Sequence, residues 1–401
     1  MRILIAGAGL GGLTAGLALI KRGFEVCIVE QAHALKEVGA GVQLSPNCTR
    51  ALFKLGLEAV LMAAASETAG KEIRLWNSGQ CWPLFDLGSI SRERYGFPYL
   101  TVHRAHLHAA LVAAVEQAQP GAVMLGAKIA VIQQHSEKEG EQVAILTTDG
   151  RCFKGALLIG ADGVHSVVRA HLFGPDTPRF SGLAAWRGVI DAAGLPAHLR
   201  RPVGVNWVGP GAHVIHYPLA GGRQVNFVGV IERSGWTVES WTEQGTVEQC
   251  LADFRGWHAD VQALIQAVKV PYQWALMVRE PMARWSGGRI TLLGDACHAA
   301  LPMLAQGAAM AIEDGYLLAR ALEQFAGDPQ LAFERYEAAR QDRTAQVMRG
   351  SAANAQRFHN PALATADGAT DYIDREWSEA SVKERYEWLF AYDVDRVLLS
   401  A

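Results

Sequence analysis

Mostly hydrophobic runs of four to six residues recur along the chain and predict buried strands of a parallel sheet. The first two cover residues 2–6 and 24–29, and later ones cover 156–159 and 289–293. Between the first two, residues 13–22 are mainly small or apolar and stop before a glycine, which is typical of a short buried helix. The opening of the chain therefore predicts a strand–helix–strand unit of an α/β domain.

A different pattern occupies the middle of the chain, between about residues 180 and 278. Short β-like runs are separated there by Gly-Pro or Gly-Gly turns, which predicts an antiparallel sheet inserted into the α/β body. The runs cover residues 184–190, 203–208, 213–217 and 224–230. A helical pattern at 247–268 interrupts them, and long helical patterns return beyond residue 295 and continue to about 356.

The first predicted strand leads directly into G-A-G-L-G-G at residues 7–12, a G-x-G-x-x-G pattern in its strand–turn–helix setting. In such a unit Gly7 makes the tight turn, Gly9 lets the backbone approach a pyrophosphate, and Gly12 allows close packing. The N–H groups at the start of the helix then attract phosphate. Glu30 ends the second strand, where an acid accepts from a ribose 2′-hydroxyl. The unit predicts a dinucleotide site for either FAD or NAD, the alternative being a plain strand–helix–strand unit.

Composition excludes several classes of function. The chain has 401 residues, 19% of them charged, and a net charge of −3, so neither nucleic acid nor an anionic membrane is an expected partner. The six cysteines include no C-x-x-C pair, which favours reduced thiols in a cytoplasm over a redox disulfide or a metal cluster. The first hydrophobic run is about five residues long, too short for a signal peptide or a membrane span.

Three further elements bear on the choice between FAD and NAD. Arg104 opens a predicted helix and could hold a pyrophosphate, although arginines at helix starts are often merely solvated. Asp162 and Asp295 each follow a predicted buried strand, at the edge where α/β proteins bind ligands, and each could instead belong to an ordinary strand-to-helix turn. Gln306-Gly307 opens a helix whose N–H groups could face the negative charge of a reduced flavin.

Taken together, these elements resemble the single-component FAD-dependent aromatic hydroxylases of the para-hydroxybenzoate-hydroxylase-like superfamily. The branch that contains salicylate hydroxylase, 3-hydroxybenzoate 6-hydroxylase and 6-hydroxynicotinate 3-monooxygenase is the most similar. The resemblance covers nearly the whole chain and includes Trp186-Arg187-Gly188 in the predicted sheet. It implies an α/β fold in which a Rossmann-like FAD-binding domain carries an inserted antiparallel-sheet substrate domain and C-terminal helices.

The resemblance also implies domain boundaries and a cofactor site. The FAD-binding domain comprises residues 1–70, 98–178 and 279–350, the substrate domain comprises 71–97 and 179–278, and the C-terminal helical region comprises 351–401. FAD is expected to contact Gly9, Gly11, Gly12, Glu30, Gln31, Gln43, Arg104, Ile129 and Asp295, with Gln306, Gly307 and Ala308 near the flavin ring. Gly7 and Asp162 complete the expected set.

The implied activity is hydroxylation of a small phenolic or hydroxypyridine acid, with decarboxylation if the target carbon carries the carboxylate. In this family NADH or NADPH reduces the flavin, and O2 then forms a flavin C4a-hydroperoxide that delivers the hydroxyl group. A base near the substrate hydroxyl should assist. On the strand at 213–217, His213 and Tyr217 face one side and His216 the other, so they cannot all address one pocket. The resemblance favours His213 and Tyr217 as the catalytic candidates, because related hydroxylases place substrate-contacting residues on this strand, and His216 is held in reserve.

Several points stay open from the sequence. Gln43 stands where relatives can carry histidine, and Pro302 lies near a position that is polar in others, so the substrate is not identified. A flavin epoxidase or monooxygenase of a larger polyketide or isoprenoid, and a nicotinamide-dependent dehydrogenase, are the alternatives. A non-catalytic FAD-binding regulator also fits, whereas a disulfide reductase is disfavoured by the absence of a cysteine pair. A homodimer is one expectation for assembly.

Overall fold

The computed structural model describes residues 1–35, 40–135, 142–235 and 243–399. Its first layer is a six-stranded sheet that is parallel except at one edge. In spatial order the strands are β18 (Ser286–Gly287), β19 (Ile290–Leu292), β12 (Leu157–Gly160), β1 (Arg2–Ala6), β2 (Glu25–Val29) and β8 (Val123–Met124). Continuous hydrophobic runs form these strands because both faces of the sheet are covered, and side chains such as Ile3, Leu4 and Ile5 have no exposed surface.

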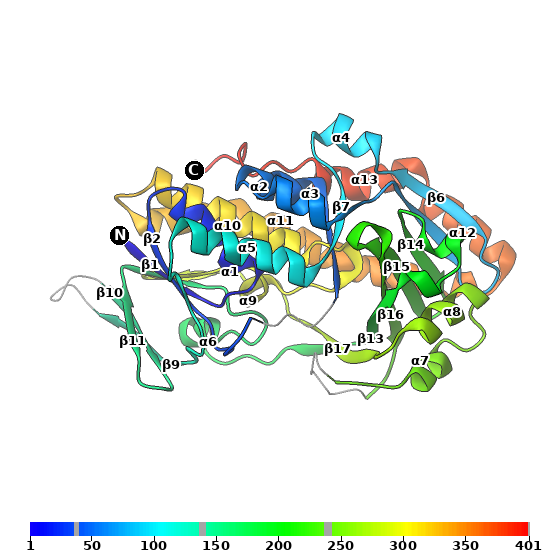
Figure 1. Cartoon of the computed structure of the whole chain (residues 1–401), viewed down its shortest axis with the longest axis horizontal. Helices are drawn as coiled ribbons and strands as arrows, with labels where there is room; N and C mark the ends of the chain where they lie inside the picture. The colour runs from blue at the N-terminus through cyan, green and yellow to red at the C-terminus, as the bar shows by residue number, and fades with distance from the viewer. Residues whose placement is uncertain (36–39, 136–141, 236–242, 400–401) are drawn as a thin grey trace.

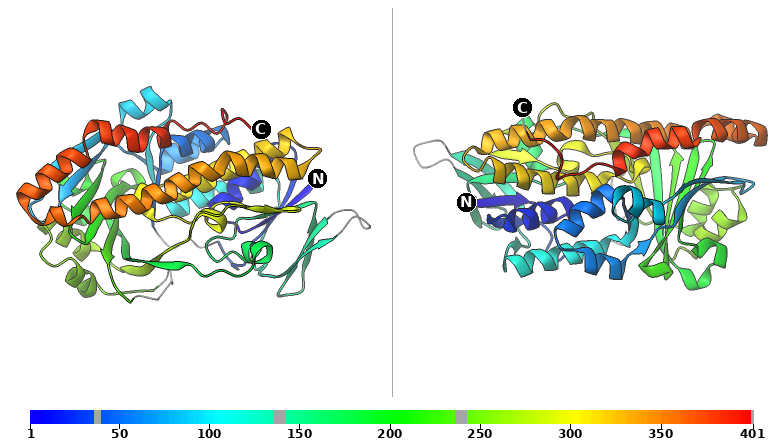
Figure 2. Two further views of the ribbon diagram at one scale, coloured as in Figure 1. Left: turned by 180° about the vertical axis from the view of Figure 1, so that it is seen from behind. Right: turned by 90° about the horizontal axis from the view of Figure 1, so that it is seen from above.

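Long helices pack beside this sheet (Figure 1). They are α1 (Leu10–Ile20), α5 (Arg104–Ala118), α10 (Gly307–Gln324) and α11 (Pro329–Phe358). Helices α1 and α10 approach closely because a Cβ on Gly315 would lie 2.7 Å from the backbone nitrogen of Ala15. Seen from behind, α11 runs from this layer to the second sheet (Figure 2).

The second layer is a seven-stranded sheet formed by the middle of the chain together with one early hairpin. Its order is β17 (Tyr272–Val278), β13 (Arg179–Asp191), β16 (Gln224–Glu232), β15 (Ala212–Leu219), β14 (Val203–Gly209), β5 (Gly70–Leu75) and β6 (Cys81–Asp86). All neighbouring pairs are antiparallel except β14–β5. The α/β fold with an inserted sheet is therefore confirmed.

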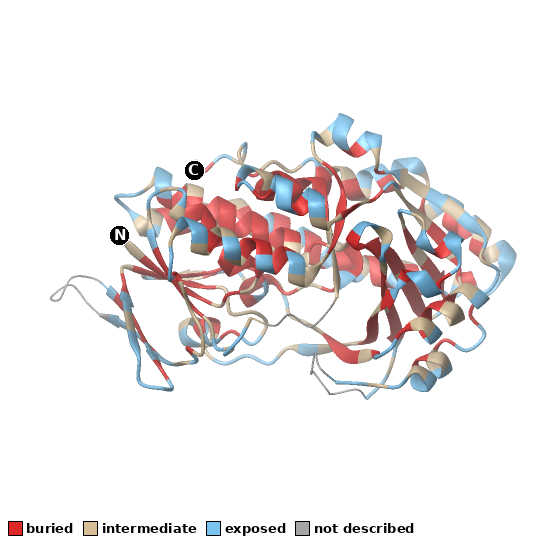
Figure 3. Cartoon of the chain, in the orientation of Figure 1, coloured by how far each residue is buried: buried red, intermediate tan, exposed pale blue. Residues whose placement is uncertain are grey.

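Different helices cover the two faces of the seven-stranded sheet. One face packs on α7 (Val247–Asp253) and α8 (Ala259–Ala267) through large side chains such as Trp207 and Phe227. The other face packs on the end of α11, on α12 (Ala366–Glu376) and on α13 (Glu379–Phe390). The aromatic residues near the C-terminus thus form part of the core on that face. In the burial colouring the strands of this sheet are largely red, whereas the C-terminal helices also show tan and blue surface (Figure 3).

Two small sheets and the remaining helices complete the fold. The sheets are β11 (Cys152–Gly155), β10 (Gln142–Thr147) and β9 (Ile129–His135), and β3 (Gly41–Leu44), β7 (Leu100–His103) and β4 (Ser66–Glu67). The helices are α2 (Pro46–Lys54), α3 (Glu58–Ala64), α4 (Ser89–Tyr95), α6 (Val167–Phe173) and α9 (Asp295–His298). No helix within the described ranges is long and apolar enough to span a membrane.

Two sequence expectations differ from these elements. The single helix expected at 247–268 is two helices, because the chain turns between them at Gly256, whose φ of +81° no helix can contain. The expected division at residue 350 falls inside α11, which continues to Phe358. That helix links the two sheets, so the boundary between the cofactor region and the C-terminal region is not a break in the chain's secondary structure.

Candidate cofactor and substrate site

Three turns meet at one edge of the six-stranded sheet. Strands β1, β12 and β19 are adjacent, with Ala6 paired to Gly160 and Gly160 paired to Leu292. The turns that follow these strands begin at Gly7, Ala161 and Leu293, so they share the carboxyl edge where open α/β sheets bind ligands. Residues that are far apart in the sequence are thereby brought together as expected.

The glycines of the first turn have different surroundings. Gly7 has φ +100°, and a Cβ there would lie 2.5 Å from the carbonyl oxygen of Ala161. A Cβ on Gly12 would lie 2.0 Å from the Gly7 oxygen, and one on Gly11 would lie 2.7 Å from the Leu293 side chain. Gly9 alone among the four has no atom within 4 Å of a built Cβ. Gly9 is therefore the position at which a ligand can approach the backbone, and the other three allow the turn to pack.

Glu30 is held in place by the backbone at the end of β2. Its carboxylate accepts hydrogen bonds from the N–H groups of Ala8, at 2.9 Å, and of Ala32, at 2.8 Å. This fixes the acid beside the glycine-rich turn, where an adenosine ribose would lie. Gln31, the next residue, is exposed.

The two aspartates at the strand ends differ in their contacts. The Asp162 carboxylate accepts from the Ser166 hydroxyl at 2.5 Å and from the Val167 N–H at 2.8 Å, so it caps the start of α6. Burial raises its pKa. Asp295 is exposed although its neighbours Ala296 and Cys297 are buried. The geometry thus leaves the Asp295 carboxylate available to a cofactor and gives Asp162 a role in shaping its turn.

The remaining cofactor candidates lie on separate elements around this edge. Arg104 is the first residue of α5, and its backbone N–H donates to the carbonyl of Ala40 at 2.9 Å, next to β3. Gln43 on β3 is half-buried, and its side-chain oxygen accepts from the Tyr99 hydroxyl at 2.8 Å. Ile129 begins β9 and is half-buried against the core. The structure describes no direct contact between Ile129 and the other candidates.

Helices α1 and α10 both begin without a side chain that caps their first N–H groups. By contrast, α11, α12 and α13 are capped by Asp328, Thr365 and Ser378. Uncapped amides at a helix start carry positive partial charge and suit an anionic ligand. At α10 the first residues, Gly307 and Ala308, are half-buried, and a Cβ on Gly307 would meet open space.

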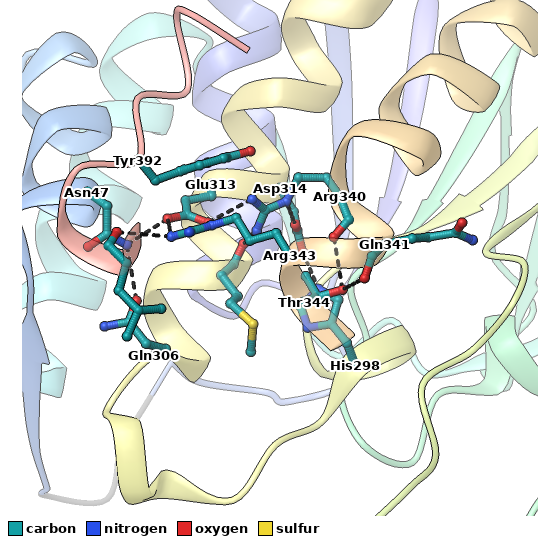
Figure 4. A network of polar contacts seen from close by, with 12 residues as sticks. Asn47, His298, Gln306, Glu313, Asp314, Arg340, Gln341, Arg343, Thr344 and Tyr392 are labelled. Atoms are coloured by element: carbon teal, nitrogen blue, oxygen red, sulfur yellow. Dashed lines mark hydrogen bonds and ion pairs between the residues drawn. The ribbon is translucent and has the colours of Figure 1, made fainter. Parts of the chain in front are cut away.

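The residue that precedes α10 is locked by a buried polar network (Figure 4). The Gln306 amide donates to the Ser45 hydroxyl at 2.9 Å and accepts from the Asn47 amide at 3.1 Å. Asn47 in turn donates to the Glu313 carboxylate at 2.6 Å. The start of α10 is therefore tied to α2 and to its own second turn, which preorganises the helix end.

Four buried charges support this arrangement. Glu313 pairs with Arg343 at 2.7 Å and with Arg340 at 2.8 Å, and Asp314 pairs with Arg340 at 2.7 Å. Asp314 also accepts from His298 at 2.5 Å, and its interactions with His298 and Arg340 lower its pKa to about 2 although burial opposes this. The guanidinium groups hold the pKa of Glu313 below its ordinary value in the same way.

This network reaches the C-terminal region. Arg343 donates to the carbonyl oxygen of Leu389 at 3.2 Å and lies 3.7 Å from the ring centre of Tyr392. Sequence reasoning missed these residues. An adjacent Glu-Asp pair inside an apolar helix, with two arginines three positions apart on the next helix, is the pattern that could have indicated them.

These features fit FAD on structural grounds. The fold offers an open backbone position at Gly9, a fixed acid at Glu30, an exposed carboxylate at Asp295 and an uncapped helix start at α10. A dinucleotide needs a site for a ribose and a pyrophosphate, and a flavin also needs a polar, preorganised site for its ring. All of these lie on the described elements.

On the face of the seven-stranded sheet that packs with Met310 of α10, one row of residues keeps exposed surface, and the space above that row is called the hollow from here on. Residues in the middle of a covered sheet are normally buried, and most here are, but one row is half-buried. Its members are paired across three strands: Asn206 on β14, Ile215 on β15 and Val228 on β16. Leu301, Met303 and Leu304, which lead into α10, pack against the same face. The hollow therefore adjoins the expected flavin position.

His213 and Tyr217 flank this row on β15, because side chains two residues away on either side of Ile215 share its face. The Nδ1 atom of His213 lies 2.7 Å from Nε2 of His359, and Nδ1 of His359 lies 3.2 Å from the Glu232 carboxylate. If His359 donates to that carboxylate, its Nε2 must accept from His213. The Nε2 atom of His213 is then unprotonated. Burial lowers the pKa of His213 well below its ordinary value, which keeps the ring neutral.

Tyr217 is also buried and stands close to β3. A Cβ on Gly41 would lie 2.7 Å from the Tyr217 ring, and the Gly41 N–H donates to the Asn226 side chain at 2.7 Å. The seven-stranded sheet is thus joined to the cofactor region at this point. Burial raises the pKa of Tyr217, so its hydroxyl stays protonated.

His216 lies on the opposite face of the sheet. It is buried near Trp207, whose indole N–H donates to His216 Nδ1 at 3.4 Å, and burial lowers its pKa to about 3. It cannot reach the hollow on the other side of the sheet, so we do not retain His216 as a catalytic candidate.

Comparison with known proteins shows which family this chain resembles. A family model described as an FAD binding domain matches residues 1–351. The chain is 37% identical to 3-amino-4-hydroxybenzoate 2-monooxygenase of Streptomyces platensis, over 98% of this chain and 96% of the relative. It is 35% identical to 3-hydroxybenzoate 6-hydroxylase of Polaromonas naphthalenivorans, over 99% and 97%. It is also 35% identical to 6-hydroxynicotinate 3-monooxygenase of Pseudomonas fluorescens, over 99% and 96%.

A solved structure agrees with these relatives. HpxO of Klebsiella pneumoniae, in complex with FAD and uric acid, superposes with a TM-score of 0.82 at 25% identity and covers 100% of this chain and 98% of that one. The resemblance seen in the sequence is thereby confirmed. The chain belongs to the FAD-binding-domain family, among the FAD-dependent aromatic hydroxylases.

Proposed function

We propose that this protein uses FAD, O2 and either NADH or NADPH to hydroxylate a small phenolic or hydroxypyridine carboxylic acid in the cytoplasm. Decarboxylation accompanies the reaction if the target carbon carries the carboxylate. The hollow between the seven-stranded sheet and the start of α10 is the observation that carries this proposal. Its support from relatives is that three of them, each aligned along nearly the whole chain, are named for hydroxylation of small aromatic acids.

The bound flavin would supply the redox chemistry, accepting hydride from the nicotinamide and activating O2. Gly9, Glu30 and Asp295 would hold the dinucleotide, and the first N–H groups of α10 would face the ring. The apolar side chains above the hollow, such as Leu301 and Met303, would exclude water from the reaction.

His213 is the proposed base. Because the Glu232–His359 pair leaves Nε2 of His213 unprotonated, this atom can accept the proton of the substrate hydroxyl and make the ring more electron-rich. Tyr217, at the other side of the hollow, would hold the substrate through its protonated hydroxyl. Glu232 is largely exposed, so the accepted proton has a hydrogen-bonded path to solvent.

Purified protein should contain or bind FAD, visible in its absorbance spectrum. We expect 3-hydroxybenzoate, 6-hydroxynicotinate or 3-amino-4-hydroxybenzoate to stimulate oxidation of NADH or NADPH and to gain one oxygen atom, measured by mass spectrometry with isotopically labelled O2. Stimulated oxidation with no labelled product for these acids or for uric acid would contradict the proposal. Size-exclusion chromatography tests the expected homodimer in the same preparation.

The proposed base has a matched control on its own strand. We expect His213→Asn to lower kcat/KM by about 10²- to 10⁴-fold, the range that general base catalysis contributes. His216→Asn, three positions away but on the opposite face, should change kcat/KM far less. Equal losses in the two variants would mean that the effect is structural. A His213 variant with unchanged turnover would remove this residue from the mechanism.

A further inference from the structure

Lys71 lies on the sheet face that carries the hollow. It is paired with Gly204 on β14, and extension of the β14–β15 register by one residue places Tyr217 on the far side of Gly204. Directly paired residues share a face, and two strand spacings place Lys71 about 10 Å from Tyr217. Gly204 has no side chain to fill the space between them. Lys71 is half-buried, like the row of residues that outlines the hollow.

The Lys71 ammonium group has a fixed direction. Its Nζ donates to the Tyr99 hydroxyl at 2.8 Å and lies 4.7 Å from the centre of the Tyr99 ring. Tyr99 in turn donates to Gln43, one of the expected cofactor contacts. An ammonium group has three N–H donors, and one of them is used by Tyr99. The lysine is thus held beside the hollow, and the other two N–H groups of its ammonium can donate to a ligand.

The surroundings of Lys71 carry no opposite charge among the described residues. Burial alone lowers the pKa of its ammonium group to about 7. The groups that interact electrostatically with Tyr99 are Tyr217, Tyr386 and Cys48, and burial raises the pKa of each, so all are neutral. The adjacent Glu72 points to the other face of the sheet, where it pairs with Arg201 at 2.7 Å.

A second cation faces the same hollow. Arg187 on β13 lies in the row of Val228 and Ile215, on the side away from Lys71. Its guanidinium group lies 5.0 Å from the ring centre of Trp274 and 5.6 Å from that of Tyr272. Aromatic faces already stabilise this charge, whereas the charge of Lys71 has one neutral hydroxyl beside it.

We infer that Lys71 binds the carboxylate group of the aromatic acid, with Tyr99 fixing the direction of the ammonium group. This assignment rests on the proposed function, since it requires that the substrate is an acid. The carboxylate would lie toward β5 and the ring over Ile215 and Val228, with the hydroxyl toward His213. Lys71 is then a specificity-determining residue that selects acids over neutral analogues.

This assignment predicts proton uptake. A carboxylate beside Lys71 favours the charged form and raises its pKa above the value in the free protein. At pH 8 the free lysine is mostly neutral, so binding of an acid must take up a proton, and affinity must fall as pH rises further. Lys71→Arg keeps the charge without a titration in this range, so it should bind acids without proton uptake.

Calorimetric titration of the FAD-loaded protein tests this. We would titrate 3-hydroxybenzoate and 3-hydroxybenzamide at pH 8 in two buffers with different ionisation enthalpies, which measures affinity and proton uptake together. We expect Lys71→Met to weaken binding of the acid by about 10- to 100-fold, the value of a hydrogen bond between charged groups. Binding of the amide should change by less than about threefold. Lys154→Met, an exposed lysine on β11, is the matched control.

The outcomes are distinguishable. If Lys71→Met leaves affinity for the acid unchanged, or weakens acid and amide equally, the inference is wrong. A loss of acid binding in Arg187→Met without one in Lys71→Met would assign the carboxylate to Arg187 instead. An unchanged affinity with a lower kcat would make Lys71 a proton carrier and overturn the inference too. If wild-type protein binds neither 3-hydroxybenzoate nor 6-hydroxynicotinate, the proposed function itself fails. Should Lys71→Met lose flavin, Lys71→Arg carries the test, because the inference requires this variant to bind the acid without the proton uptake of the wild-type protein.

Discussion

Two groups of enclosed charged side chains among the described residues differ in how far an opposite charge compensates them. Around α10 and α11, Glu313 and Asp314 are fully buried, and each has a guanidinium partner within 2.8 Å. Within the described part of the chain, the Lys71 ammonium group donates to a neutral hydroxyl and has no acidic partner. Burying a charge is costly unless it is paired, so paired charges can belong to the structure, whereas an unpaired one indicates a site completed by a ligand. The comparison separates residues that hold the cofactor region from residues that select the substrate.

Removing a charge from the paired group around α10 and α11 should have the largest effect on stability. We expect Glu313→Gln to lower the free energy of unfolding by about 3–5 kcal/mol, because it leaves two buried guanidinium groups short of a counter-charge. Urea unfolding measures this. Glu323→Gln, on the same helix but in an exposed pair with Arg22, should cost less than about 1 kcal/mol. Similar values for the two variants would contradict the distinction between buried and exposed pairs.

A substitution at Gly204 would place an opposite charge beside Lys71. A Cβ there would lie 3.6 Å from Cγ of Lys71, an ordinary contact, so Gly204→Asp places a carboxylate beside the ammonium group. We expect affinity for 3-hydroxybenzoate to fall by about 10- to 100-fold, because the new acid competes for Lys71.

Gly204→Asn has the same shape without the charge and serves as the control in the same titrations. It should retain most of the affinity for 3-hydroxybenzoate. If both variants lose binding equally, affinity depends on the space beside Lys71 and not on its charge, which would contradict the inference.

The smallest expected effect concerns stability and pH. In the unfolded chain Lys71 has an ordinary pKa, whereas in the free folded protein its pKa is about 7. Below pH 7 both states carry the charge, and above it the unfolded state binds more protons. Wild-type stability should therefore rise with pH from 7 toward 10 relative to Lys71→Met, by a few degrees in Tm. Parallel Tm curves for the two proteins across this range would show that the lysine is not buried as described.

Local patterns predicted the parts of the site that depend on neighbouring residues. The turn at 7–12, Glu30, and the strand ends before Asp162 and Asp295 all follow from short runs of sequence, and the structure brings them to one sheet edge. The alternation of β15 correctly separated His213 and Tyr217 from His216. These features need no knowledge of distant contacts, since a strand and the turn that follows it are read from adjacent positions.

Other parts depend on contacts that no local pattern contains. Residues 71–82 alternate partly like a surface hairpin, a pattern that does not indicate that the Lys71 side chain is enclosed. It is enclosed because the aromatic side chains of α13, more than 300 residues later, pack over Tyr99. His359 likewise reaches His213 across 146 positions of sequence, because the end of α11 lies beside β15.

Helix α11 sets a distance within the site. It places Arg343, which supports the start of α10, 16 positions before His359, which fixes the ring of His213, a separation of about 24 Å along the helix. An insertion of one residue between them would rotate everything that follows by about 100° and carry His359 away from His213, while leaving the Arg343 pair intact. The chain length between these two residues is therefore fixed by the chemistry at both ends, and insertions or deletions in this family should avoid that stretch of α11, since even a whole helical turn would shift His359 by about 5 Å along the helix.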